Sequence, residues 1–122
     1  MTFRHLALLS SVLLFGLSAV WMLAPELMLT QWGVQYSDGA GLVSRRAAAF
    51  YAGIALMLLL ARNTEASKAR FALAKGVSLT CLILATLGIL EWQSGSATAQ
   101  ILVAVVLEAV LAFAFLLSNK AK

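Results

Sequence analysis

The sequence predicts an all-α protein that crosses a membrane four times as an up-down-up-down helical bundle. Four apolar segments each approach the ~20 residues that span a bilayer core, at about residues 3–24, 42–62, 69–92 and 97–118. Apolar residues form 62% of the 122-residue chain, against roughly 45–50% in soluble domains, and the mean hydropathy is +0.94. Because the links are short, we expect a single membrane domain, whose ligands or partners are met in the membrane or at its surfaces.

The first apolar segment is predicted to be a spanning helix rather than a secretory signal. Its apolar run from Leu6 to Leu23 is longer than the ~7–15 residues of a signal core, and no small-x-small cleavage site follows. The residue before a proline is disfavoured in a helix, so Pro25 should mark the break. A short amphipathic segment at about 26–33 can then lie at the headgroup boundary.

The remaining links also contain turn signals. Residues 33–41 include three glycines and an Asp-Gly pair, residues 63–68 are polar, and Gly95-Ser96 separates the last two segments. Glycine supplies the positive φ angles that such turns need. Since short links make consecutive helices antiparallel neighbours, each spanning helix is expected to pack against the next.

The distribution of basic residues predicts that both termini are cytoplasmic. The N-terminal end, the second link and the C-terminal tail, with their flanks, hold most of them: Arg4, Arg62, Lys68, Arg70, Lys75, Lys120 and Lys122. The positive-inside rule therefore orients the chain, and three tryptophans and Tyr36 then fall at the outer interface. The net charge of +4 is explained by this flanking pattern, so no nucleic-acid partner is inferred. The expected location is a bacterial inner membrane, with multiple passes.

Glu108 is the most informative single residue, because it lies near the middle of the fourth apolar segment. A charged carboxylate in hydrocarbon is costly, so this side chain is expected to face other helices, to be paired or to be protonated. It is a candidate proton or cation site, or a polar anchor for a ligand headgroup. The alternative is a structural hydrogen bond to Ser78, Thr80 or Lys75 on the third segment.

Lys75 and Tyr51 are the candidate neighbours of Glu108. Lys75 lies about one turn inside the third segment, and its long side chain can either pair with Glu108 or extend to the inner interface. Tyr51 lies mid-span in the second segment, where its hydroxyl needs a partner. Glu108 is one such partner at a similar depth.

Arg45 and Arg46 are outer-side arginines that depart from the positive-inside pattern. Adjacent helical residues point about 100° apart, so the two cannot face one partner. One is expected to pair with Asp38 or Glu91, and the other to reach a headgroup phosphate. The alternative is that they form the mouth of an outer-leaflet pocket for an anionic or quinone-like headgroup, with Trp92 as its apolar wall.

Few side chains could hold a metal or a cofactor. Cys81 is the only cysteine, which excludes an intramolecular disulfide and a CxxC pair, so it is expected to serve packing. His5 is the only histidine and has no second ligand candidate nearby. The sequence also lacks a phosphate loop, an HExxH motif and a Ser-His-Asp set. No cofactor, metal centre or catalytic residue is predicted.

Residues 45–56, RRAAAFYAGIAL, open the second segment with an Arg-small-aromatic-x-Gly pattern, and Ala24-Pro25-Glu26 ends the first. Over residues 1–60 this pattern resembles the small four-helix bacterial membrane proteins grouped around DoxX. The resemblance implies a small membrane subunit beside a catalytic oxidoreductase partner, with Arg46 and Gly53 inheriting the family pattern. Because this chain has no cysteine pair or histidine pair, redox chemistry by the chain itself is not expected.

The sequence thus favours a non-catalytic integral membrane subunit or scaffold that binds a membrane partner, a lipid or a quinone-like ligand. The partner would be another membrane protein or a second copy of the chain. One alternative is a small dimeric proton-coupled transporter that uses Glu108. It is similar in plan to the small multidrug-resistance transporters, although their glutamate lies on the first helix. Another alternative is the small subunit of a membrane oxidoreductase.

Overall fold

The computed structural model describes residues 2–118, and in that range the chain is all-helical. It forms five helices, α1 (Phe3–Leu23), α2 (Pro25–Gln31), α3 (Asp38–Ala61), α4 (Lys68–Gln93) and α5 (Ile101–Ser118). The all-α prediction is confirmed, and α1, α3, α4 and α5 are long and apolar enough to cross a membrane. Lys120 and Lys122, which contributed to the predicted orientation, lie outside the described residues.

Local capping explains most helix boundaries. The side chains of Thr2, Ser37 and Ser67 accept hydrogen bonds from backbone N–H groups at the starts of α1, α3 and α4, as N-cap residues do. Since Ser37 caps α3, that helix begins at Asp38 and not near residue 42. Pro25 occupies the first turn of α2, where its missing N–H costs nothing.

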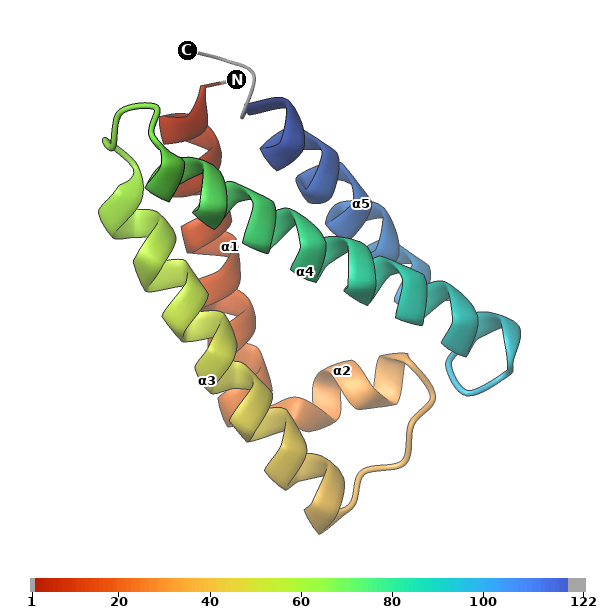
Figure 1. Cartoon of the computed structure of the whole chain (residues 1–122). Coiled ribbons are helices and arrows are strands. Elements are labelled where there is room, and N and C mark those ends of the chain that lie inside the picture. The colour runs from red at the N-terminus through yellow and green to blue at the C-terminus, as the bar shows by residue number, and fades with distance from the viewer. Residues whose placement is uncertain (1, 119–122) are drawn as a thin grey trace.

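The four long helices form two pairs rather than one closed bundle. α1 packs along α3, and α4 packs along α5, while α3 and α4 have few contacts with each other. Figure 1 shows the two pairs diverging from one end, with the short α2 lying between them at the other. The expectation that consecutive spanning helices are neighbours therefore holds within each pair but not between α3 and α4.

The same polar contact joins the helices of each pair. Ser18 on α1 donates its hydroxyl hydrogen to the Ala48 carbonyl on α3 at 2.7 Å, and Ser78 on α4 donates to the Ala112 carbonyl on α5 at 2.8 Å. Both alanines are fully buried. Small residues let neighbouring backbones approach closely in membranes, where packing and hydrogen bonds replace the hydrophobic drive.

The two helix pairs are connected at two places, one at each end of the molecule. At one end Phe3 and Phe115 stack edge to face with ring centroids 6.4 Å apart, inside a cluster that also contains Leu58 and Val77. At the other end Thr98, in the α4–α5 link, donates its backbone N–H to the Trp32 carbonyl at 2.9 Å and its hydroxyl to the Gln31 carbonyl at 2.6 Å. These hydrogen bonds to residues 31 and 32 are here called the Thr98 clasp. α5 begins after this clasp, at Ile101, and not at about residue 97 as predicted.

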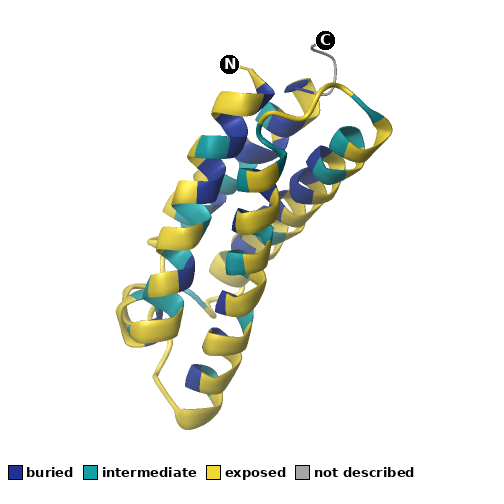
Figure 2. Cartoon of the chain, turned by 90° about the vertical axis from the view of Figure 1, so that its left-hand side faces the viewer, coloured by how far each residue is buried: buried dark blue, intermediate teal, exposed yellow. Residues whose placement is uncertain are grey.

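The outward surfaces of the long helices are exposed, as the yellow faces in Figure 2 show. Large apolar side chains lie on these faces, among them Val12, Phe50, Leu60 and Val103. Soluble monomers rarely expose apolar patches of this extent. The exposed faces therefore match acyl chains, and the buried residues mark where the helices pack on each other.

Candidate functional site

A cleft lies between the two helix pairs, under α2. It consists of two adjoining cavities of about 270 and 260 Å³. We call it the inter-pair cleft and define it by the residues that line both cavities, which are Trp32, Tyr51, Leu84, Ala104 and Glu108. Its position follows from the fold, because the pairs diverge from the Phe3–Phe115 contact and are bridged at the other end by α2 and the Thr98 clasp.

Helical spacing places the lining side chains of α4 and α5 on the helix faces that border the cleft. On α4, Leu84, Leu87, Gly88 and Glu91 follow the i, i+3, i+4, i+7 pattern of a single face, and all four line the larger cavity. Ala104 and Glu108 extend the wall from α5, one turn apart. The faces of α4 and α5 that line the cleft are thus not packed against the other helix pair, and the space between them stays open.

Two tryptophans cover the part of the cleft next to α2. Trp21, near the end of α1, and Trp32, just after α2, have ring centroids 5.4 Å apart at an interplanar angle of 55°, and both line the larger cavity. Pro25 reverses the chain between them, so two residues eleven positions apart become neighbours. The structure places these two rings against each other in the cleft wall.

Glycine ends both α2 and α4 with the same backbone motif. Gly33 has φ +75° and Gly95 has φ +83°, and the next residue in each case donates its N–H to a carbonyl five positions earlier, Leu29 or Glu91. This pattern is the Schellman motif. A Cβ on Gly33 would also lie 2.7 Å from Thr98 Cγ2, so this glycine permits the Thr98 clasp.

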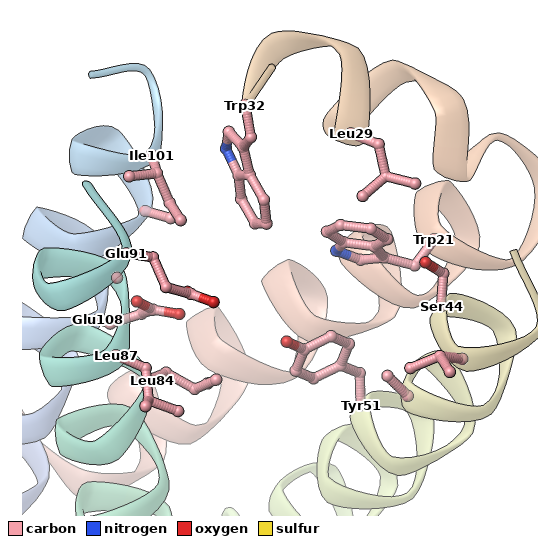
Figure 3. Close-up of a pocket in the computed structure, with 14 residues that line it drawn as sticks. Trp21, Leu29, Trp32, Ser44, Tyr51, Leu84, Leu87, Glu91, Ile101 and Glu108 are labelled. Carbon is pink, nitrogen blue, oxygen red and sulfur yellow. The ribbon is translucent and has the colours of Figure 1, made fainter. Parts of the chain in front are cut away.

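Glu108 and Glu91 both extend into the cleft, and the Tyr51 hydroxyl points toward them from α3 (Figure 3). Glu108 is half-buried, and within residues 2–118 it makes no hydrogen bond or ion pair. The structural bonds expected for it are not formed, because Ser78 donates to Ala112 and Thr80 donates to Gly76 in its own helix. The structure thus brings Glu108 together with Tyr51, as expected, and with Glu91.

Lys75 does not reach the cleft. It is exposed, and it lines neither of the two cavities. The predicted Lys75–Glu108 pair is absent from the described part of the chain.

Arg45, Arg46 and Trp92 also lie outside the cleft. The α3 residues that line it are Val43, Ser44, Ala47 and Tyr51, whereas neither arginine lines either cavity. In the described range neither arginine forms an ion pair with Asp38 or Glu91. Glu91 faces the cleft and Trp92, about 100° further round the helix, does not line it. The structure therefore separates the residues that the sequence grouped as an outer-leaflet pocket.

Several lining residues were not identified from the sequence, notably Ser44 and Gly88. The i+3 spacing of Ser44 and Ala47 and the i+7 spacing of Leu84 and Glu91 were available signals, but helical spacing assigns a face and not its partner. Cys81 is buried in the core cluster, as expected for a packing residue. Among residues 2–118, no group of three or more His, Cys, Asp or Glu side chains is placed to hold a metal ion.

Comparison with models of protein families, with curated proteins and with solved structures found no match to this chain.

Proposed function

We propose that this chain is a non-catalytic, multi-pass protein of a bacterial inner membrane, of the DoxX-like kind, that binds an amphipathic ligand in the inter-pair cleft. The supporting observation is the cleft itself, an apolar cavity between two helix pairs with a few convergent polar groups. Small-molecule sites typically combine apolar walls with a small number of polar groups in this way. A transporter would in addition require the cleft to open to each side of the membrane in turn, and the structure presents one arrangement of the pairs.

The proposed orientation places both termini in the cytoplasm and the Thr98 clasp at the outer face. It is supported by Arg4, Arg62, Lys68 and Arg70 near the end where α1 and α5 meet, since cytoplasmic loops are rich in Lys and Arg. A reporter enzyme that is active only outside the cytoplasm, fused to the C-terminus, should therefore give no activity. Periplasmic activity of this fusion would reverse the proposed orientation.

The cleft can be tested by filling it. Ala104 lines both cavities, so Ala104→Phe should occupy the space that a ligand needs. We expect 3-bromodecan-1-ol, a neutral amphiphile whose bromine lies close to its headgroup and quenches indole fluorescence, to quench Trp21 and Trp32 saturably in phosphatidylcholine nanodiscs. Ala104→Phe should abolish the saturable part. The experiment uses a Trp92→Phe background, because the chain has three tryptophans and Trp92 lies outside the cleft.

The matched control is Val106→Phe, which adds the same ring on the exposed side of α5. This variant should retain saturable quenching. Quenching that rises linearly with bromodecanol in the parent protein, as bilayer partitioning alone gives, would remove the support for a ligand-binding cleft.

A further inference from the structure

We propose that the inter-pair cleft selects amphipathic cations, a quaternary ammonium or similar headgroup carried on an apolar chain, over neutral and anionic amphiphiles. This inference rests on the proposed function and specifies the ligand class. It differs from the anionic or quinone-like ligand suggested by the sequence, because the arginines on which that suggestion depended lie outside the cleft.

The charge of the cleft wall has one sign. Glu91 and Glu108 line it, and no Lys, Arg or His does so among the residues of either cavity. Two acidic side chains between low-dielectric walls create a negative potential that concentrates cations and repels anions. Charge complementarity therefore points to a positively charged occupant.

A bound cation would give the Glu108 carboxylate the charged partner that it lacks among residues 2–118. Its carboxylate lies near the middle of a spanning helix, half-buried, and makes no hydrogen bond or ion pair within residues 2–118. An ionised carboxylate that is desolvated without a partner is strongly disfavoured. A bound cation stabilises the ionised form by close opposite charge, whereas a neutral or anionic headgroup does not.

The aromatic side chains add a second attraction for the same headgroup. The Trp21 ring lies across the cleft from Glu91 and Glu108, and the Trp32 ring, 5.4 Å from the Trp21 ring, lies between the two sides (Figure 3). Indole faces attract quaternary ammonium groups through the ring quadrupole, more strongly when the cation is desolvated. A cation in the cleft would contact aromatic rings as well as carboxylates.

The second cavity provides space for the apolar part of the ligand. It extends from Glu108 along α1 and α5, where Leu13, Leu14, Leu17 and Leu111 line it. A chain bound there would contact aliphatic side chains while its headgroup remains near Glu108. Both properties of an amphipathic cation therefore have a counterpart in the cleft.

The test compares three chain-matched probes that carry bromine close to the headgroup, 3-bromodecyltrimethylammonium, 3-bromodecan-1-ol and 3-bromodecane-1-sulfonate. Binding is followed by saturable quenching of Trp21 and Trp32 in phosphatidylcholine nanodiscs with the Trp92→Phe background. We expect the cation to bind at least about tenfold more tightly than the alcohol, and the sulfonate most weakly. In the Glu91→Gln/Glu108→Gln double variant the cation should bind no more tightly than the alcohol. Unchanged alcohol binding in that variant shows that the cleft is intact.

The control is Glu26→Gln, which removes an exposed carboxylate on α2 outside both cavities and should keep the cation preference. Equal binding of cation and alcohol by the parent protein, or a preference that survives the double variant, would overturn the inference and leave the ligand-binding cleft standing. Absence of saturable quenching with all three probes would instead overturn the proposed function.

Discussion

Replacing Phe115 with alanine is expected to weaken the junction of the two helix pairs and to lower the free energy of unfolding by about 2 kcal/mol. Phe115 has no exposed surface and contacts Phe3 of the other pair. In soluble proteins a buried Phe→Ala change costs about 3–5 kcal/mol. In a bilayer the transfer part of this cost is small, because lipid tails are also apolar, so the lost packing contacts dominate.

The control for this prediction is Phe113→Ala, two positions along the same helix. The Phe113 side chain is 61% exposed and faces outward, so its removal should change the free energy of unfolding by less than about 0.5 kcal/mol. Both variants can be measured by reversible unfolding in dodecyl sulfate, followed by tryptophan fluorescence. Equal losses for the two variants would show that the Phe3–Phe115 contact does not hold the pairs together.

Gly88→Ala is expected to lower the free energy of unfolding by about 1–3 kcal/mol, the usual cost of overpacking. Gly88 is buried on α4, and a Cβ there would lie 2.6 Å from Val105 Cγ2 on α5. A β-branched side chain in a helix has essentially one χ1 rotamer, so Val105 cannot move aside easily. The added methyl group should therefore push α4 and α5 apart beside the cleft.

Gly76→Ala provides the matched comparison, because it makes the same change on the same helix. No atom lies within 4 Å of a Cβ built on Gly76. Alanine is intrinsically better than glycine in a helix by up to about 1 kcal/mol, so this variant should be neutral or more stable. The unfolding midpoint in dodecyl sulfate should thus be lower for Gly88→Ala than for Gly76→Ala. A Gly88→Ala protein as stable as Gly76→Ala would contradict the close α4–α5 packing.

Features that depend only on residues close together in the sequence were predictable from it. The four apolar segments correspond to α1, α3, α4 and α5, because the length of an apolar run is itself what spans a bilayer. The break at Pro25 and the turn at Gly95 were also predicted, since backbone restrictions act locally. The start of α3 at Asp38 was missed, because the Ser37 side chain caps the helix within residues assigned to a loop.

The candidate site was predicted only in part, because its residues lie on different helices. Tyr51 and Glu108 were proposed as neighbours from their similar depth, and both line the cleft. Depth, however, does not give the direction of a side chain around the helix axis. Arg46 and Glu91 were both assigned to the outer end, yet Glu91 lines the cleft and Arg46 lines neither cavity.

The order of residues is enough to predict that the chain is helical, where its apolar helices begin and end to within a few residues, and that an acidic side chain lies deep in the last one. These properties follow from composition, capping and chain length. The three-dimensional arrangement is needed to see that the helices form two pairs joined at Phe3–Phe115 and at Thr98, and that Glu91 and Glu108 share a cleft. Close packing between helices is non-local, so which faces meet is set by contacts such as Ser18–Ala48 and Ser78–Ala112 and not by the pattern along any one helix.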